Sequence, residues 1–370
     1  MNRAAERPEL RQTTFSPYPL GVNPQWRRLG PALVVALFLT LPCASEAETR
    51  IADDPAQLLA MYQPVLLFHA AEDWAPQTVD RYLTRTRVER QVTKGTWSPV
   101  PPPLPTSTVG CVLSPCLRLN LPCVLRSGYA CYHQQAVANT DWKAPVVYGT
   151  VAPVSASTPP PPGQTQRPSL LLHYWLFYAF DDWHSLHDRL WQTHEGDWES
   201  ITVGLDAANT PLFAAYSEHC SGTVSRWSTV TRRGGTHPVA YVALGSHANW
   251  FTSSAADTRF GECLKSGLGA VAKARLTTLI RLAEDNVVDR MGTAHASGPA
   301  GLPGVTPMTL IPLARNTATW MRYPGKWGEG EIVWLGKTPR SATTISRGSA
   351  PGTPKWFAQQ VATAWHPLAG

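Results

Sequence analysis

The sequence predicts a mainly β protein, an antiparallel β-sandwich with added helices. Short apolar or alternating runs, each closed by turn residues, recur along the chain, and such spacing is typical of sandwiches and barrels. The composition agrees, because 43% of the 370 residues are hydrophobic and only 16% are charged. Fifteen Trp residues are an unusual number, and we assign most of them to a thick core, because the indole is large and mainly apolar.

The expected strands cover much of the chain. Residues 170–180 are apolar on both faces, as expected for a central strand that is covered on each side. The other expected strands are residues 62–69, 194–205, 211–219, 237–251, 307–313 and 331–336.

Helices are expected at three places. In residues 268–291, Leu276, Ile280 and Val287 fall on one face, which predicts an amphipathic helix packed on the sheet. Residues 78–84 and 355–365 are shorter helical candidates.

Residues 1–47 have the features of a secretory signal peptide. Arg27 and Arg28 precede an apolar run at residues 32–41, and small residues stand at the two positions that signal peptidase reads. The run is too short to span a bilayer, which needs about 20 apolar residues. We therefore expect a secreted or periplasmic protein without a transmembrane segment in the mature chain.

The net charge of +6 is modest and spread along the sequence. The chain contains no Lys/Arg cluster with interleaved aromatic residues, and this excludes nucleic-acid binding as an expected function. The charge allows only a weak attraction to anionic surfaces.

We predict one sandwich domain over residues 48–370, with residues 98–168 as a Pro-rich, disulfide-bearing insertion. An even number of cysteines in an exported chain predicts disulfides, with their pairing left open. Zinc is the alternative for residues 111–131, but the spacings of five, seven and eight match no common Cys-pair finger. The six cysteines are Cys111, Cys116, Cys123, Cys131, Cys220 and Cys263.

The sharpest chemical signal is the run His-Glu-Gly-Asp-Trp-Glu at residues 194–199. In a strand, alternate residues share a face, so Asp197 and Glu199 point the same way as the apolar Ile201 and Val203. Burying unpaired carboxylates costs several kcal/mol, roughly, unless they are neutralised or bound by a cation. His194 is a natural further ligand. The alternative is a buried network without an ion.

Oxygen ligands favour Ca²⁺ or Mg²⁺, whereas the imidazole of His194 also admits Mn²⁺ or Zn²⁺. His219 and His247 each close an expected strand, and such strand ends can converge on the acidic run. If the protein is an enzyme, we expect a metal-dependent hydrolase with His219 or His247 as general base. Ser246 is a weak nucleophile candidate, because it lacks the Gly-x-Ser-x-Gly turn.

Several phrases resemble the family related to vacuolar protein sorting-associated protein 62. They are residues 62–76, 174–180, Gly-Asp-Trp-Glu at 196–199, Tyr-Ser-Glu-His at 216–219, and residues 237–248 with their Gly-Ser-His-Ala. The resemblance runs from about residue 58 to 251, and more weakly to Trp327, without residues 98–168. It implies no particular reaction.

The spacing His-x-x-Asp-x-Glu, with Trp198 between the acids, is more distantly similar to the signature heptapeptide of the necrosis- and ethylene-inducing-like proteins. These are secreted sandwiches of cytolysin-like shape that bind a divalent cation and act on host membranes through sphingolipid glycans. The resemblance implies His194, Asp197 and Glu199 as metal ligands. Asp181 or Asp182 would complete the set, and we choose Asp182.

The chain departs from that heptapeptide at three positions. Thr193 precedes His194 where the family has Gly, Gly196 replaces a second His, and Glu195 replaces a basic residue. These departures leave cation binding as an expectation without implying membrane lysis.

We predict a secreted, cation-binding sandwich that recognises a glycan or lipid headgroup at a cell surface, with an effector or cytolysin-like role as one form of it. The alternatives are a metal-dependent hydrolase of phosphoesters or glycosides, and a structural exported protein without catalysis. The sequence leaves the oligomeric state open.

Overall fold

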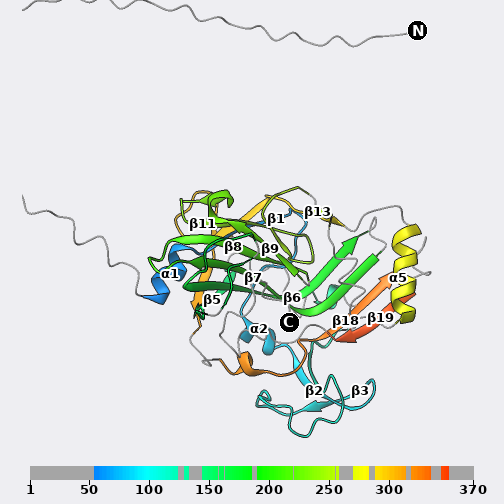
Figure 1. Ribbon diagram of the computed structural model, residues 1–370. Coiled ribbons are helices and arrows are strands. Elements are labelled where there is room, and N and C mark those ends of the chain that lie inside the picture. The colour runs from blue at the N-terminus through cyan, green and yellow to red at the C-terminus, as the bar shows by residue number, and fades with distance from the viewer. Residues whose placement is uncertain are drawn as a thin grey trace, which may run out of the picture. The chain divides into compact units, whose positions relative to one another are not determined.

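Two β-sheets and a small β arm make up most of the structure (Figure 1). The structure is a computed structural model. It describes residues 54–123, 129–132, 144–156, 158–161, 163–185, 190–219, 221–254, 256–257, 270–282, 288–313, 318–334 and 343–349. The expected signal peptide at residues 1–47 and the expected helix at residues 355–365 lie outside these residues. The prediction of a mainly β, sandwich-like fold is confirmed.

The larger sheet is built around two strands of 16 residues each, β6 (Leu170–Ser185) and β7 (Leu190–Leu205). They pair antiparallel over their whole length, from Leu170 opposite Leu205 to Ser185 opposite Leu190. Six more strands complete this sheet. They are β5 (Val146–Pro153), β8 (Pro211–Glu218), β9 (Ser221–Arg226), β17 (Thr309–Pro312), β18 (Glu329–Trp334) and β19 (Thr343–Ser349).

The second edge of β7 is shared by two different partners. Its last residues, from Ile201 to Leu205, pair with β8, whereas its first residues, from Leu190 to His194, pair with β18. Figure 1 shows the two strand pairs β8–β9 and β18–β19 diverging on either side of this point. Residues 195–200 therefore pair with β6 on one edge and have no strand partner on the other within the described part of the chain.

The second sheet combines strands from distant parts of the sequence. Its order is β10 (Arg232–Arg233), β11 (His237–Val242), β1 (Val65–Phe68), β15 (His295–Gly298) and β16 (Thr306–Pro307), with β12 (Asn249–Trp250) paired to β11. Three pairs among the described strands are parallel, namely β1 with β11, β15 with β16, and β17 with β5. Alternation along a strand does not encode the direction of its neighbour, so the sequence predicted only antiparallel pairs.

A large aromatic core fills the main body of the fold. Trp198 lies at its centre, with its ring centroid 4.8 Å from that of Phe177 and 5.6 Å from that of Trp320. The buried indoles are those of Trp74, Trp175, Trp183, Trp198, Trp320 and Trp327. All of these except Trp183 belong to the aromatic core, and the other described Trp residues are partly buried.

Short helices flank the sheets. They are α1 (Pro55–Met61), α2 (Val79–Leu83), α3 (Tyr129–Tyr132) and α5 (Ala270–Leu282), with 3₁₀ turns η2 (Trp227–Thr229) and η3 (Thr319–Arg322). The expected helix at 78–84 is confirmed as α2, which Thr78 caps by accepting a hydrogen bond from the Arg81 amide. No helix among the described residues is long and apolar enough to cross a membrane.

The helix expected at 268–291 is shorter than the pattern indicated. It is present as α5, but the extended strand β14 (Val288–Asp289) pairs with β13 (Ala256–Asp257) before residue 291 is reached. Asp289 is buried and accepts hydrogen bonds from two indoles. These long-range bonds, which periodicity cannot reveal, outweigh the helical preference.

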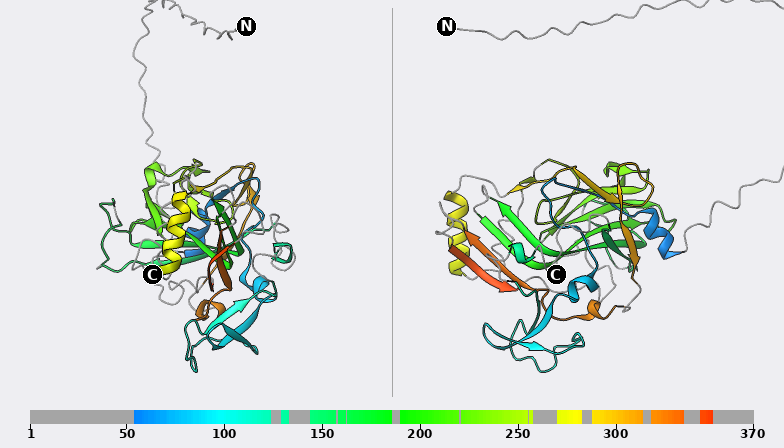
Figure 2. Two further views of the ribbon diagram at one scale, coloured as in Figure 1. Left: turned by 90° about the vertical axis from the view of Figure 1, so that its right-hand side faces the viewer. Right: turned by 180° about the vertical axis from the view of Figure 1, so that it is seen from behind.

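The expected insertion at 98–168 also needs correction at both ends. Strands β2 (Arg87–Thr93), β3 (Thr96–Val100) and β4 (Leu117–Asn120) form a separate three-stranded arm that begins before residue 98 (Figure 2). Strand β5, by contrast, pairs with β6 in the larger sheet. This pairing makes β5 part of the main fold.

Disulfides, not zinc, occupy the described cysteines. Cys111 is bonded to Cys116, and Cys123 is bonded to Cys131. Disulfides of this kind are typical of oxidising, extracytoplasmic compartments. Cys220 and Cys263 lie outside the described residues.

Candidate functional site

The acidic run lies in the middle of β7, where the strand passes from its β18 partner to its β8 partner. The unpaired edge at residues 195–200 leaves room for side chains and turns from other elements to approach. A cluster of buried polar side chains gathers around this part of β7.

Asp181, His194 and Asp197 form a buried group whose potential ligand atoms all lie within 4.8 Å of one another. His194 Nε2 lies 3.5 Å from Asp181 Oδ2 and 4.0 Å from Asp197 Oδ1. Asp181 is on β6 and stands directly opposite His194 in the register. Opposed residues in an antiparallel pair share a face, which brings these two side chains together.

Asp182, the fourth ligand expected from the sequence, is not part of this group. Its Oδ1 lies 3.0 Å from His184 Nε2. Because successive strand residues point to opposite faces, Asp182 faces away from the side that Asp181 shares with His194. The resemblance left both positions open, and the register favours Asp181.

Gly196 allows His194 and Asp197 to converge. Residues three apart in a regular strand point to opposite faces, but Gly196 has φ +58°, which turns the strand locally. A Cβ on Gly196 would also lie 2.6 Å from Cβ and the carbonyl oxygen of Trp327. Only glycine meets both requirements.

Glu199, also expected as a ligand, lies near Asp197 and Asp181 but is not part of the group, and it is almost fully buried. It accepts a hydrogen bond from the Ser217 hydroxyl. Ser217, at the end of β8, in turn accepts a hydrogen bond from the Ser200 amide at 2.8 Å. The Ser217 hydroxyl thus satisfies a backbone amide of β7 that would otherwise bond to a neighbouring strand.

His247 is fully buried between two carboxylates. Its Nδ1 lies 2.9 Å from Asp197 Oδ2, and its Nε2 lies 3.6 Å from Glu72 Oε1. Its ring stacks on Tyr178 at a centroid distance of 3.7 Å and an angle of 2°. The sequence pointed to His247 but missed Glu72, since only tertiary structure joins residue 72 to this turn.

The turn that carries His247 interrupts the expected strand 237–251, because β11 ends at Val242. Gly245 has φ +78°, and a Cβ there would lie 2.3 Å from the carbonyl oxygen of Asp182. Glu72 fixes the turn by accepting hydrogen bonds from the Gly245 amide at 2.8 Å and the Trp74 amide at 3.0 Å.

The electrostatics of the cluster reflect burial. Burial and the neighbouring Asp197 raise the pKa of both Asp181 and Glu199, and burial lowers the pKa of His194. Burial alone would lower the pKa of His247, but Glu72 and Asp197 raise it to about 10.

Within the described chain, no Lys or Arg forms an ion pair with any of these carboxylates, and their only ionic partners are histidines. The hydroxyl of Tyr178 and the side-chain oxygen of Asn249 are also buried without a hydrogen-bond partner among the described residues. Buried polar groups in this state require a water or an ion. The donor set of two carboxylates and one imidazole therefore fits a divalent cation.

His219 belongs to a separate, neighbouring cluster. Its Nε2 lies 2.8 Å from Asp289 Oδ2, and Asp289 also accepts from the indoles of Trp183 and Trp250. Ser246 Oγ lies 3.5 Å from the same carboxylate. Asp289 thus ties the ends of several strands together, and the carboxylate beside His219 differs from the two beside His247.

A cavity of about 480 Å³ adjoins the cluster. Glu72 and Gly245, which hold the His247 turn, form part of its wall, and so does Asp182. Trp191 and His184 also contribute, with their rings stacked at 4.3 Å and 12°. The other lining residues are Ala71, Asp73, Trp74, Leu244 and Arg290.

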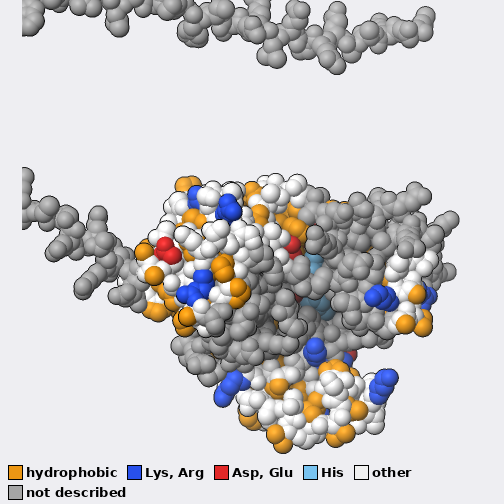
Figure 3. All heavy atoms as spheres, viewed as in Figure 1, with side chains coloured by type: hydrophobic (Ala, Val, Ile, Leu, Met, Phe, Trp, Pro, Cys, Tyr) orange, Lys and Arg blue, Asp and Glu red, His pale blue; other side chains and the backbone are white. Residues whose placement is uncertain are grey.

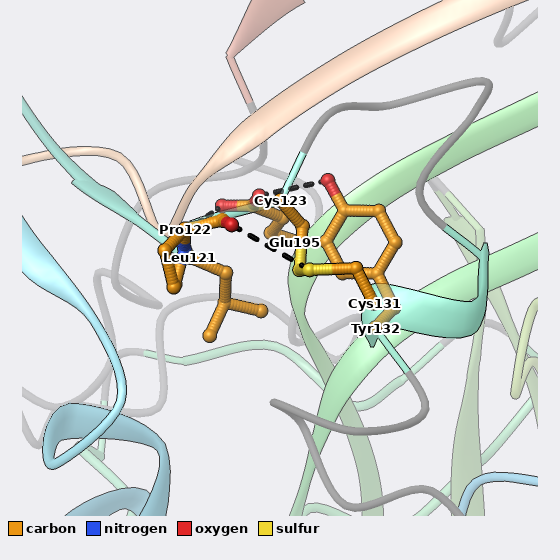
Figure 4. Close-up of a disulfide and its surroundings, with 6 residues drawn as sticks. All are labelled: Leu121, Pro122, Cys123, Cys131, Tyr132 and Glu195. Atoms are coloured by element: carbon orange, nitrogen blue, oxygen red, sulfur yellow. Dashed lines mark hydrogen bonds between the residues drawn. A yellow bond between two sulfur atoms is a disulfide. The ribbon is translucent and has the colours of Figure 1, made fainter.

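Glu195 faces the arm instead of the cation group (Figure 4). It is fully buried and accepts hydrogen bonds from the Tyr132 hydroxyl at 3.0 Å and the Leu121 amide at 3.1 Å. Burial raises its pKa to about 8. Tyr132 directly follows Cys131, which is bonded to Cys123 near Leu121, so the hydrogen bonds of Glu195 fasten this segment to β7.

No family model and no curated protein matches the chain. Solved structures of toxin proteins are similar to part of it. Necrosis and Ethylene inducing Protein 2, from the causal agent of cocoa's Witches Broom disease, is 16% identical, with 53% of this chain and 67% of that chain covered and a TM-score of 0.26. NLPPya in complex with glucosamine is 16% identical, with 63% and 92% covered and a TM-score of 0.28.

A third structure, described as a toxin fold for microbial attack and plant defense, is 14% identical, with 62% and 91% covered and a TM-score of 0.28. The neighbours are therefore toxins of the kind named in the distant resemblance. Similarity at such low TM-scores assigns neither a site nor an activity to this chain. The resemblance to the vacuolar protein sorting-associated protein 62 family gains no support.

Proposed function

We propose that this protein is an exported binding protein with a divalent cation held by Asp181, His194 and Asp197, and a glycan or glycosylated lipid headgroup held in the adjoining cavity. The observation that carries the proposal is the buried Asp-His-Asp group beside a cavity with an aromatic wall. Export would follow from the predicted signal peptide at residues 1–47.

The cation would neutralise carboxylates that lie too deep for water to do so. Carboxylate oxygens favour Mg²⁺ or Ca²⁺, and the single imidazole also admits Mn²⁺ or Zn²⁺. Glu199, held by the Ser217 hydroxyl, would complete the negative charge around the ion. His247 lies between Asp197 and Glu72, and it would hold the carboxylates of these two residues in place.

The cavity has the chemistry that sugars require. An aromatic ring such as Trp191 can pack against the C–H face of a sugar, and carboxylates such as Asp182 accept hydrogen bonds from its hydroxyl groups. Polar groups set among apolar walls are typical of small-ligand sites. Asp182 follows Asp181 directly in the chain, so the sugar and the cation would be held by adjacent residues of β6.

Binding is favoured over catalysis by the position of the two histidines that we considered as general bases. His247 is fully buried and packed between two carboxylates and a tyrosine ring. His219 is bonded to Asp289. We assign both a positioning role, because a general base must reach the proton that it removes.

The proposal is tested by metal analysis of the purified protein, followed by glycan-array binding with Mg²⁺ or Ca²⁺ and with chelator. We expect a bound divalent cation, and glycan binding that the chelator abolishes. Trp191→Ala should abolish glycan binding while the cation is retained. Trp227→Ala, which removes a half-buried indole outside the cavity lining, is the matched control. A protein that contains no cation and binds none in titration calorimetry refutes the cation claim, and unchanged glycan binding by Trp191→Ala refutes the cavity.

A further inference from the structure

The β2–β3–β4 arm exposes most of the large hydrophobic side chains that the described surface presents. These are Val92 (53% exposed), Val109 (83%), Val112 (95%) and, outside the arm, Val271 on α5 (84%). Single exposed apolar residues are ordinary, whereas several on one protruding element make that element a candidate interaction surface.

The three arm valines lie at the same end of the arm. Val92 is near the end of β2, and the loop with Val109 and Val112 packs beside that end. The Arg90 guanidinium lies 3.9 Å from where a Cβ on Gly110 would stand, and the Gln91 amide donates to the Cys116 carbonyl at 2.9 Å. The Cys111–Cys116 disulfide closes the loop over this contact. Val112 lies within this closed loop, Val109 lies two residues before it, and Val92 lies on the adjacent strand β2.

The charge around the valines has one sign. Residues 85–120 contain five Lys or Arg residues and a single acid, Glu89. Glu89 is buried and paired with Arg87 and Arg118, which leaves Arg85, Arg90 and Lys94 to give the arm its positive charge. Lys94 at the tip is exposed. Figure 3 shows Lys and Arg side chains beside hydrophobic atoms over the lobe formed by β2 and β3.

The arm is also braced against the main body. Arg118 pairs with Glu89 at 2.7 Å and with Glu329 of β18 at 2.6 Å, and its guanidinium lies 4.2 Å from the centroid of the Trp97 ring. The Leu119 amide donates to the Lys326 carbonyl at 2.7 Å. Because these contacts hold the arm to the main body, the tip of the arm can enter a lipid surface while the arm stays folded.

We propose that the tip of this arm, formed by Val92, Lys94, Val109 and Val112, docks on an anionic lipid bilayer. The valines would enter the headgroup region, and the basic side chains would contact anionic headgroups. This inference is independent of the cation and glycan sites, because none of their residues lies on the arm. The positive surface fits anionic lipid better than a second copy of the same arm, which would bring like charges together.

The test is co-sedimentation of the full chain with vesicles of phosphatidylcholine, with and without phosphatidylserine, in the presence of chelator. We expect binding only to the phosphatidylserine vesicles, and a loss of binding at high salt, where charge attraction is screened. Because chelator is present, binding through a metal ion cannot produce this result. A failure of the cation site would therefore leave it unchanged.

Two arm variants and one matched control sharpen the test. Val109→Ser with Val112→Ser should weaken vesicle binding at least tenfold, and Lys94→Glu about fivefold or more. Val271→Ser changes an equally exposed valine on α5 and should have no effect. All three should keep the melting temperature of the wild type, because the substituted side chains are exposed.

Three outcomes overturn the proposal. They are no binding to anionic vesicles, equal weakening by Val271→Ser and the arm variants, and arm variants that convert a dimer to a monomer in gel filtration without changing vesicle binding.

Discussion

Asp181 and His194 stand opposite each other on β6 and β7, with Oδ2 of the aspartate 3.5 Å from Nε2 of the histidine. This pairing determines which of two adjacent aspartates can serve the cation group. Asp182, one residue further along β6, instead contacts His184 and lines the cavity.

Asp181→Asn should therefore weaken divalent-cation binding on the order of tenfold or more, because a charged oxygen ligand is lost. Asp182→Asn is the matched control and should leave cation affinity within about twofold, since it removes no ligand. Titration calorimetry with Mg²⁺, Ca²⁺ and Mn²⁺ measures both. If Asp182→Asn lost the cation and Asp181→Asn did not, the register argument would be wrong.

Gly196→Ala should destabilise the fold by roughly 3 kcal/mol or more, because it combines an unfavourable positive φ with a clash against Trp327. Gly235→Ala provides the comparison. Gly235 also has positive φ, at +84°, but a Cβ there meets nothing within 4 Å, so the cost should be only about 1 kcal/mol. Urea unfolding of the two variants separates the clash from the backbone strain, and equal costs would contradict the role assigned to Trp327.

Glu72→Ala should destabilise the protein by roughly 3 kcal/mol, since it leaves the buried amides of Trp74 and Gly245 without their acceptor and removes one of the two carboxylates beside His247. Glu72→Gln keeps an acceptor oxygen and should cost less. Thermal unfolding gives both values. A Glu72→Ala protein as stable as the wild type would show that the His247 turn does not depend on this side chain.

His173 predicts how the stability of the fold depends on pH. It is buried on β6, with Nδ1 2.9 Å from Thr202 Oγ1, and burial lowers its pKa from 6.5 to about 4. The unfolded chain therefore binds a proton between these two pH values while the folded chain does not. The stability that neutral His173 contributes is complete above pH 6.5 and is lost as the pH falls toward 4, by roughly 3 kcal/mol in all.

Replacing His173 by Gln removes this titration and keeps a side chain that can hydrogen-bond. The difference in unfolding free energy between wild type and His173→Gln should shift by that amount between about pH 7 and about pH 4, in favour of the variant at the acid end. Denaturant titrations at the two pH values measure the shift. A difference that does not change with pH would contradict the burial effect.

Local pattern was sufficient for several features. The two-sided apolar run at 170–180 predicted the centre of β6, and the alternation at 194–205 predicted β7 with its acids facing inward. Thr78 and the apolar residues after it predicted α2. Four cysteines in a Pro-rich stretch predicted disulfides but not their pairing.

Contacts between distant segments determined the features that the local sequence pattern did not predict. Residue 72 is joined to residue 247 by the packing of the two turns that carry them, and neither run of sequence indicates it. Asp289 is extended because of hydrogen bonds to Trp183 and Trp250, although its sequence context is helical. The choice of Asp181 over Asp182 depends on the register between β6 and β7, which no single strand encodes.

The sequence by itself determined the residue types and faces: a β fold rich in Trp, and acids at 197 and 199 on an inward face beside His194. Only the tertiary structure decided which groups meet there. The physical reason is that alternation is a property of one strand, whereas register, the divergence of β8 from β18 and the left-handed conformation at Gly196 depend on contacts between distant segments.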